Sequence, residues 1–263
     1  MHAPPRAALC DEPRGSLRLV SGSYFAERLG DLAPLSDAEK AALARLEERE
    51  RTLRRGASLR RENDRVGELF IVRKGMLMAS MLLDDGSRQI LRFLFPGDLI
   101  GLSGLAYRES PETITALSDC TVCPFDRAAF AELLAAHPRL AALVIVNSQI
   151  ERAALTDRLA ALGRTSARAR VAAVLIEMRN RLRMMDRSIT DAFVLGLTQE
   201  EIGDATGLTA VHVNRMLRQL EEDGLIAREG GRVHFRNEPA LAREANYVDR
   251  YEKLDLSWLP PAR

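Results

Sequence analysis

The spacing of hydrophobic and polar residues divides this chain into a strand-rich middle and helical segments on either side of it. From Thr52 to about Phe125, short apolar runs such as Leu69–Val72, Met76–Leu83 and Ile90–Phe95 are separated by glycines at regular intervals. Strands this short, with evenly placed turn signals, are typical of an antiparallel sandwich or barrel. The middle of the chain is therefore expected to be an all-β unit.

Helical periodicity is found before and after that unit. Ser36 and Glu39 form a capping box, which predicts a short helix starting there. Another helix is expected from Arg127, and after the break at His137-Pro138 a long helix should run to about Leu162. The next residue, Gly163, is expected to end this long helix in a left-handed conformation.

The long helix carries a seam of positions that repeat at alternating spacings of three and four. They are Leu140, Leu143, Asn147, Ile150, Ala154, Asp157 and Ala161. Three such heptads predict a helix that pairs with a second copy of itself, and polar seam residues would fix the register of that pair at a cost in stability. The alternative is a helix that lies against its own barrel through the neighbouring positions Val144, Leu155, Leu159 and Leu162. Both faces are apolar enough to be used at once.

Residues 197–226, LTQEEIGDATGLTAVHVNRMLRQLEEDGLI, have the pattern of two helices joined by a tight turn. Thr198 and Glu201 form a capping box for the first helix, and the small Gly203 permits a close crossing of the second. Gly207 lies where the turn requires a positive φ, and Thr209 caps the second helix. The buried stripe of that helix is expected to be Val213, Met216, Leu217 and Leu220.

The remaining face of this helix pair is polar, which predicts a DNA-reading helix-turn-helix. The candidate DNA-binding residues are Thr198, Gln199, Thr209, Val211, His212, Asn214, Arg215 and Arg218. Leu225–Phe235, with Gly230-Gly231 at its centre, predicts a hairpin directly after the recognition helix, which is the position of a wing. An ordinary αα-hairpin in a core is the alternative, but it would not need a capped helix with a polar outer face.

Composition adds limits to this picture. The chain of 263 residues is long enough for about two domains, and its net charge of +1 shows no global basic excess. The stretch from Gly163 to Arg183 is locally basic, with six arginines that could contact phosphates. No apolar run is long enough to span a membrane and the N-terminus lacks the apolar core of a secretory signal, so we expect a cytoplasmic protein without membrane contact.

The order of these units, a β-roll, a long helix and a winged helix-turn-helix, resembles the Crp/Fnr superfamily of bacterial transcription regulators. The resemblance is supported by FPGDLIGL (Phe95–Leu102) and RTSARARVAAVL (Arg164–Leu175). It implies an α+β fold with an N-terminal cyclic-nucleotide-binding-like antiparallel β-roll (a jelly roll), and a regulator that is not an enzyme. The expected parts are a flexible segment (1–25), the roll (26–136), a dimerisation helix (137–163), the winged helix-turn-helix (164–240) and a tail (241–263).

The same resemblance implies partners and contacts. A homodimer would place two recognition helices in successive major grooves of a palindromic double-stranded operator, with half-sites roughly 34 Å apart, and RNA polymerase is the expected further partner. Arg215 matches the family arginine that reads a guanine, whereas Val211 stands where the family often has glutamate. His212 is open to two interpretations, a contact to DNA or a role at the helix start. In the tail, Tyr247, Tyr251 and Trp258 are candidate packing anchors.

The sensing residues of the family are largely missing. Cyclic-nucleotide sensors have a glutamate at the position of Leu102 and an arginine-serine pair near Ser110-Pro111, so the sequence argues against cyclic-nucleotide control. Haem is also disfavoured, because none of the histidines (His2, His137, His212 and His234) lies inside the roll. No metal site can be assigned firmly, and the effector stays open.

The cysteines Cys10, Cys120 and Cys123 leave three alternatives open. By resemblance, Cys123 occupies the position of a roll ligand to an iron–sulfur cluster, but the family's compact N-terminal cysteine motif is reduced to Cys10. Residues three apart on a strand point to opposite faces, so Cys120 and Cys123 should not converge. In the first alternative the three thiols bind an iron–sulfur cluster together with a carboxylate such as Asp11. In the second, Cys10 forms a regulatory disulfide with Cys120 or Cys123. In the third, all three cysteines are small buried hydrophobic residues. The first two would make the regulator responsive to redox state or oxygen.

Overall fold

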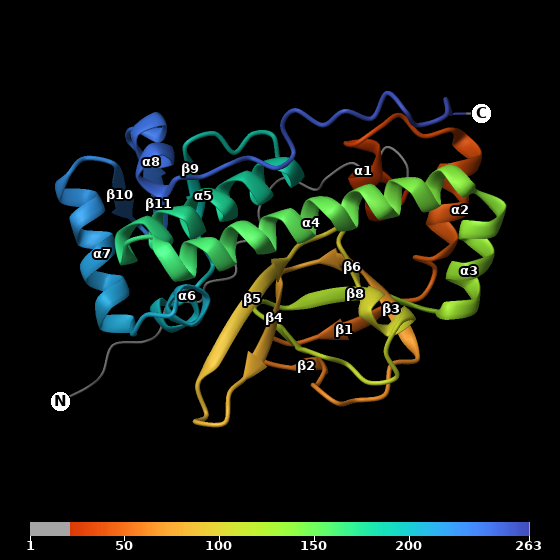
Figure 1. Ribbon diagram of the computed structural model, residues 1–263, viewed down its shortest axis with the longest axis horizontal. Helices are drawn as coiled ribbons and strands as arrows, with labels where there is room; N and C mark the ends of the chain where they lie inside the picture. Colours follow the sequence, from red (N-terminus) through yellow and green to blue (C-terminus); the bar gives the residue numbers. More distant parts are fainter. Residues whose placement is uncertain (1–21, 263) are drawn as a thin grey trace.

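The computed structural model describes residues 22–262, and Figure 1 shows a β-roll on one side of a long helix, with a smaller helical unit at its far end. The roll consists of two four-stranded antiparallel sheets, ordered β1-β8-β3-β6 and β2-β7-β4-β5. Its strands are β1 Arg51–Leu53, β2 Ser58–Arg60, β3 Glu68–Lys74, β4 Leu77–Leu82, β5 Arg88–Leu94, β6 Leu99–Ile100, β7 Thr113–Ala116 and β8 Cys120–Asp126. Side chains such as Phe70, Val72 and Ile114 fill the space between the sheets. The predicted α+β fold with an N-terminal antiparallel roll is confirmed.

Three short helices cover the outer face of the β3–β8 sheet. They are α1 Tyr24–Gly30, α2 Asp37–Arg45 and α3 Arg127–Ala136, and a 3-10 turn η1 (Leu102–Leu105) follows β6. The capping box of Ser36 and Glu39 forms as predicted. The predicted end of the flexible segment at residue 25 is too late, because Ser23 already caps α1 and Phe25 is buried in the core. Residues 1–21 of that segment lie outside the described residues.

The long helix α4 spans Pro138–Arg164, and the predicted pairing seam is wrong in its first half. Leu140, Leu143, Asn147 and Ile150 are buried within this chain, and the two leucines belong to the core formed with α1, α2 and α3. Side chains buried in their own chain have no surface left for a partner. Gly163 was expected to end the helix in a left-handed conformation, but it is helical, and α4 ends one residue later at Arg164.

The second half of the predicted seam is less enclosed, and Ala154 is exposed. Ala154, Asp157 and Ala161 line a cavity beside α4, and Asp157 forms an ion pair with Arg250 of the C-terminal tail at 2.5 Å. The outward side of α4 carries instead Ile145, which is 60% exposed, and Leu159, which is 71% exposed. The most exposed apolar side chains of α4 therefore lie on a stripe that is offset from the predicted seam.

The unit after α4 is a small α/β domain. It contains α5 Ala167–Met185, β9 Ala192–Val194, α6 Gln199–Thr206, α7 Ala210–Glu222, β10 Ile226–Glu229, β11 Arg232–Phe235 and α8 Glu238–Ala245. β10 and β11 form the predicted hairpin, and β9 adds to the edge of β11. The expected boundary at residue 240 falls within α8, whose Leu241 and Ala245 belong to the core of this domain.

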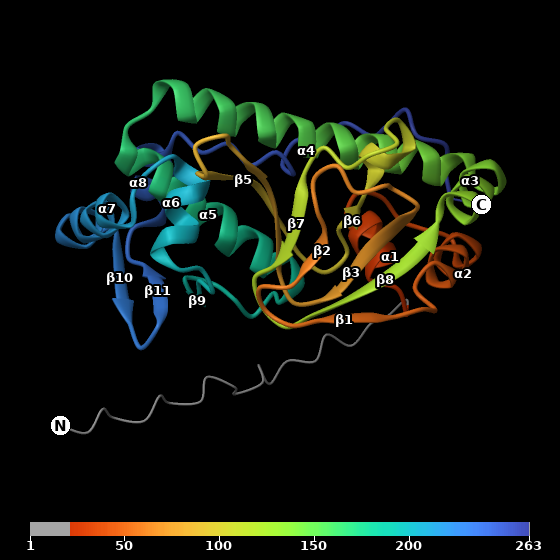
Figure 2. The same cartoon turned by 90° about the horizontal axis from the view of Figure 1, so that it is seen from below.

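This domain packs against the roll rather than standing apart from it. One continuous core joins Ile90 and Phe93 of β5 to residues of α5, α6 and the wing. Asp204 of α6 pairs with Arg88 at 2.6 Å, and Glu201 pairs with Arg55 at 3.2 Å. Figures 1 and 2 both show α6 beside β5, so the first helix of the predicted helix-turn-helix is in contact with the roll.

The C-terminal tail runs back from α8 across the molecule to the end that carries α2 and α3 (Figure 1). Tyr251 receives hydrogen bonds from Arg28 of α1 and Arg181 of α5, and Leu259 packs on the core under α1–α3. Of the expected anchors, Tyr247 and Tyr251 make such contacts. Trp258 does not serve as an anchor, since it is 60% exposed and its neighbour Leu259 packs instead.

Within residues 22–262, a single helix of the length and apolarity needed to cross a membrane is not found. Only α3 and α4 taken together reach that composition, and they are bent by 115° at their junction.

Candidate nucleic-acid interface

The helix-turn-helix forms as predicted, with its capping box and its turn glycine at the expected residues. The Thr198 hydroxyl accepts a hydrogen bond from the Glu201 backbone N–H at 3.1 Å, and the Glu201 carboxylate accepts one from the Thr198 N–H at 2.7 Å. This reciprocal capping satisfies two N–H groups that the first turn of α6 would leave unpaired. Gly207 ends α6 with φ 67°, a conformation that side chains disfavour.

The recognition helix α7 has one buried and one exposed side. Thr209 caps it by accepting a hydrogen bond from the His212 N–H at 3.3 Å. The stripe expected to be buried is buried, and it consists of Val213, Met216, Leu217 and Leu220. Val211 is 79% exposed, and His212, Arg215 and Arg218 are exposed with it. The helix therefore presents a polar and basic face to its surroundings.

The structure places the other candidate residues near this face. Thr198 and Gln199 are exposed at the start of α6, Thr209 is exposed at the start of α7, and Asn214 is half-buried. Among residues 22–262, no carboxylate forms an ion pair with Arg215, so its guanidinium is available to an outside ligand. An arginine fork suits bidentate hydrogen bonding to the O6 and N7 atoms of guanine.

The locally basic stretch before the helix-turn-helix is mostly internal, which corrects its expected role in phosphate contacts. Arg179 is 2% exposed and binds Glu238 and the Thr190 carbonyl. Arg181 binds Asp98 of the roll. Arg168 forms ion pairs with Asp223 and Glu244 of its own domain. These arginines hold the domain together and dock it onto the roll.

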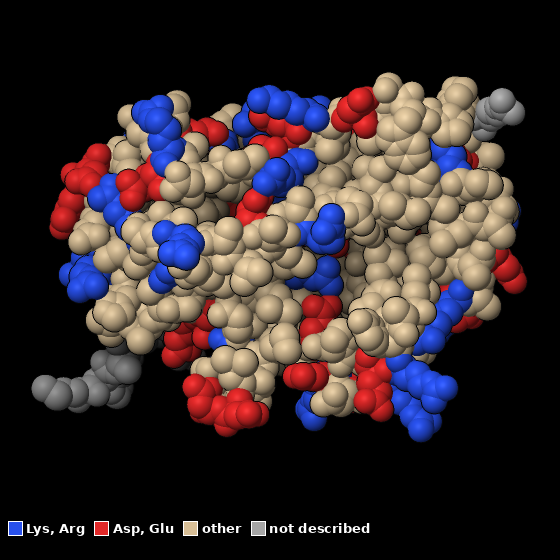
Figure 3. All heavy atoms as spheres, viewed as in Figure 1, with Lys and Arg blue, Asp and Glu red and all other residues tan. Residues whose placement is uncertain are grey.

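Figure 3 shows acidic and basic side chains interspersed over the face that carries α4. The near-neutral net charge is therefore not divided into a basic and an acidic side on that face. This face therefore presents no broad positive field to nucleic acid.

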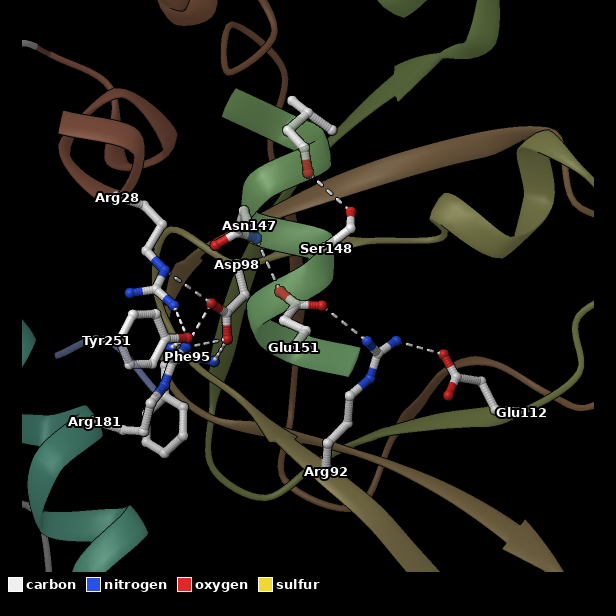
Figure 4. A network of polar contacts seen from close by, with 11 residues as sticks. Arg28, Arg92, Phe95, Asp98, Glu112, Asn147, Ser148, Glu151, Arg181 and Tyr251 are labelled. Atoms are coloured by element: carbon white, nitrogen blue, oxygen red, sulfur yellow. Dashed lines mark hydrogen bonds and ion pairs between the residues drawn. The ribbon is translucent and has the colours of Figure 1, made fainter. Parts of the chain in front are cut away.

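Buried charges link the roll, α4, α5 and the tail, and sequence reasoning did not find this network (Figure 4). Both carboxylate oxygens of Asp98 accept hydrogen bonds from Arg181 at 2.5 Å, and one also accepts the Phe95 N–H at 2.9 Å. Glu151 of α4 accepts hydrogen bonds from Asn147 at 3.0 Å and from Arg92 at 3.2 Å. Asp98 belongs to the FPGDLIGL motif, but its partner lies 83 positions away, where no local pattern reveals it.

The same network bears on ligand binding inside the roll. Arg92 of β5 is held between Glu112 at 2.7 Å and Glu151, and burial raises the pKa of the Glu151 carboxyl. Glu112 stands close in sequence to Ser110-Pro111, where the cyclic-nucleotide sensors carry their arginine-serine pair. A phosphate bound here would be repelled by the carboxylates of Glu112 and Glu151, and Arg92 is already paired with both of them.

The two described cysteines do not form a cluster site. Cys120 points into the roll interior, where its Sγ lies 3.2 Å from the Met76 carbonyl oxygen, and Cys123 is in the core under α1 and α2. They lie on opposite faces of β8, as the strand period predicts. Burial raises the pKa of both thiols, that of Cys123 to about 11, so neither is a thiolate near neutral pH.

No group of three or more His, Cys, Asp or Glu side chains in residues 22–262 could hold a metal ion. The described residues therefore do not fit an iron–sulfur cluster, and Cys120 and Cys123 have the surroundings of small buried hydrophobes. Cys10, the third expected ligand and the expected partner in a disulfide switch, lies outside the described residues.

Comparisons with known proteins agree with this geometry. Residues 50–137 match the model of the cyclic nucleotide-binding domain, and residues 169–244 match that of the Crp-like helix-turn-helix domain. The transcriptional activator protein anr of Pseudomonas aeruginosa is 32% identical over 196 residues, which cover 74% of this chain and 79% of that protein. The nitrogen fixation regulation protein FixK of Bradyrhizobium diazoefficiens is 33% identical over 65% of this chain and 71% of its own length. The solved structure of FixK2 from Bradyrhizobium japonicum superposes with a TM-score of 0.69 and 27% identity, over 76% of this chain and 98% of that one.

Proposed function

Because this chain belongs to the Crp/Fnr family and is a DNA-binding regulator of transcription, we propose that it binds a palindromic duplex as a homodimer through the exposed face of α7. The observation that carries the proposal is the recognition helix itself. It is capped by Thr209, anchored by a buried stripe, and exposes Arg215 without a carboxylate partner in the described chain. A helix with these properties can enter a major groove without rearranging its own domain.

Sequence is read by the side chains of this helix that reach base edges. Arg215 binds a guanine through two hydrogen bonds, and the exposed Val211 packs on a thymine methyl group, the apolar feature of the major groove. His212 and Arg218 lie exposed on either side of Arg215 along the helix, and Asn214 is beside it. These residues contact neighbouring bases or phosphates.

Register on the duplex is set by contacts to phosphates. Thr198 and Gln199 at the start of α6, and Thr209 at the start of α7, place hydroxyl and amide side chains at helix N-termini. Such termini favour anions, because their N–H groups point outward and the helix dipole is positive there. These contacts position the domain and carry no sequence information.

The dimer forms through the outward side of α4. Its seam consists of Ala141, Ile145, Ser148, Arg152, Leu155, Leu159 and Leu162, which alternate in spacings of four and three. Exposed Ile145 and Leu159 are the apolar residues of this seam that the rest of the chain covers least. A second copy of α4 would bury them and set the distance between the two recognition helices.

The experiment that tests the proposal is operator selection followed by substitution of Arg215. A duplex selected from a random library by the wild-type protein should be palindromic, with half-sites about one helical turn apart. Arg215→Ala should weaken binding by about 1–3 kcal/mol and relax the preference at one base pair in each half-site. Arg243→Ala is the control, because this arginine is exposed on α8, outside α6 and α7. Equal binding by wild type and Arg215→Ala would refute the assignment of α7.

The roll takes neither a cyclic nucleotide nor an iron–sulfur cluster in this proposal. Arg92 is engaged by two carboxylates, and Cys120 and Cys123 are buried on opposite faces of β8. The relatives anr and FixK are named as a transcriptional activator and a regulation protein. We extend activation through RNA polymerase to this chain on that basis.

A further inference from the structure

A cavity of about 580 Å³ lies where the roll, α4, α5, α6 and the tail meet. Cavities of roughly 300–1,000 Å³ at junctions between domains commonly hold small molecules. This cavity is separate from the interior of the roll, whose two sheets are packed together by their own side chains. It adjoins the buried charge network of Figure 4 through Asp98, Arg92 and Glu151.

The walls of the cavity are largely apolar. Phe93 of β5, Val174 of α5 and Val248 of the tail line it, and alanines of α4 and α5 leave the space open. Leu155 and Leu162 of α4 contribute to the wall and also belong to the outward seam of that helix. The cavity therefore borders the dimer contact and touches the roll and the DNA-binding domain at the same time.

Most charged side chains around the cavity are paired with each other, and Arg170 donates hydrogen bonds to the carbonyl oxygens of Leu162 and Thr165. Arg158 binds Glu177, Arg250 binds Asp157, Arg181 binds Asp98 and Arg92 binds Glu151. A charged ligand would have to break one of these pairs and leave a half-buried charge without a partner, which is strongly unfavourable. Arg183 and Arg187 also line the cavity, but they are exposed and keep their charges in water. The lining therefore favours an uncharged occupant.

One polar group in the wall is suited to orient such an occupant. The Tyr247 hydroxyl accepts a hydrogen bond from the Asn180 amide at 3.3 Å, which leaves its proton for an acceptor in the cavity. Burial raises the pKa of Tyr247 to about 12, so the hydroxyl keeps this proton throughout the physiological range. Tyr247 lies beyond residue 244, where the match to the helix-turn-helix model ends.

We propose that this cavity is an effector site for an uncharged, largely apolar small molecule that carries a carbonyl or hydroxyl oxygen, with the tail as one wall and Tyr247 as the hydrogen-bond donor. The ligand contacts β5 and α4 on one side and α5 and the tail on the other. Its binding stabilises the arrangement in which the DNA-binding domain is docked on the roll.

The test uses prodan, an uncharged naphthalene dye with one carbonyl group, added to the full-length protein. Binding in the cavity should move its emission to shorter wavelength at a stoichiometry of one dye per chain. Ala154→Trp on α4 and Ala173→Trp on α5 fill the cavity from opposite walls and should each weaken binding at least tenfold. Tyr247→Phe should weaken it about fivefold, as expected for one lost hydrogen bond. Ala131→Trp on the exposed side of α3 is the matched control and should bind as the wild type does.

Binding in this cavity and binding elsewhere on the protein predict different results. Absence of saturable binding, or equal affinity of the wild type and both tryptophan variants, would overturn the proposal, since the dye would then occupy no site or another surface. If the tryptophan variants do not fold, as judged by circular dichroism, unchanged affinity in Tyr247→Phe overturns it. The anionic dye 8-anilinonaphthalene-1-sulfonate should bind less tightly, and tighter binding that the tryptophan variants abolish would refute an uncharged ligand. The assay contains no DNA, so its failure is distinct from failure of the proposed DNA binding.

Discussion

At the scale of single residues, Gly203 sets how closely α6 approaches the start of α7. A Cβ atom at this position would overlap the backbone oxygen of Leu208, and backbone cannot move aside as a flexible side chain can. Gly163 in the last turn of α4 is helical too, but no atom lies within 4 Å of the place where its Cβ would be. The two glycines thus differ only in their surroundings.

We expect opposite effects when each is replaced by alanine. Gly203→Ala should lower the free energy of unfolding by about 1–3 kcal/mol through overpacking and should reduce operator binding. Gly163→Ala should raise it by roughly 0.5–1 kcal/mol, because alanine loses less backbone entropy in a helix. Urea denaturation monitored by circular dichroism measures both. If Gly203→Ala were as stable as Gly163→Ala, the close crossing at Leu208 would not be a constraint.

At the scale of elements, α4 carries two apolar stripes, and each follows a heptad-like spacing. One stripe, which includes Leu140 and Leu143, is covered by α1, α2 and α3 of the same chain. The other, which includes Ile145 and Leu159, faces outward. A helix with two such stripes can join its own domain on one side and a second copy on the other.

A charge on the outward stripe should therefore dissociate the dimer. Leu159→Glu places two carboxylates in the proposed seam, and we expect the dissociation constant to rise about a hundredfold or more, because the charges are buried without partners. Leu82→Glu on β4 is the matched control, since this leucine is 65% exposed and lies outside the seam. Light scattering after size-exclusion chromatography measures the mass. A dimeric Leu159→Glu variant would show that another surface joins the copies.

The comparison of α6 and α7 with α4 shows which structural features can be predicted from the sequence. Caps, turns and the buried stripe of α7 depend on residues within a few positions of each other, and the helix-turn-helix was predicted down to Thr198, Gly207 and Thr209. The first half of the predicted seam of α4 is covered by its own chain, because both stripes have the same period and only α1–α3, far away in sequence, decide which one is covered there. The roles of Arg181 and of the tail depend on equally distant partners.

At the scale of the whole molecule, the DNA-binding domain is held on the roll by a shared core, by ion pairs and by the tail. Arg88 and Asp204 are 37% and 27% exposed, so their pair alone contributes modestly. It nevertheless joins β5 directly to α6, the helix that also supports α7. Release of α6 from the roll would therefore change where the recognition helices lie in the dimer.

The contact between β5 and α6 can be tested by reversing the charge of one partner in the ion pair and then of both. In Asp204→Arg, two arginines face each other, and we expect the docked arrangement to lose about 1–2 kcal/mol. Trypsin should then cleave faster, by roughly tenfold, after the exposed Arg164 between α4 and α5.

The double variant Arg88→Asp with Asp204→Arg restores opposite charges and should return cleavage to near the wild-type rate. Arg88→Asp alone should resemble Asp204→Arg, because it sets two carboxylates against each other. The control for the added charge is Asp186→Arg, which lies beyond α5 and makes no ion pair within the described chain. Equal cleavage in all variants would mean that the shared core and the tail hold the domain without help from this pair. Faster cleavage in the single variants, reversed in the double one, would show that contacts between β5 and α6 control the freedom of the DNA-reading domain.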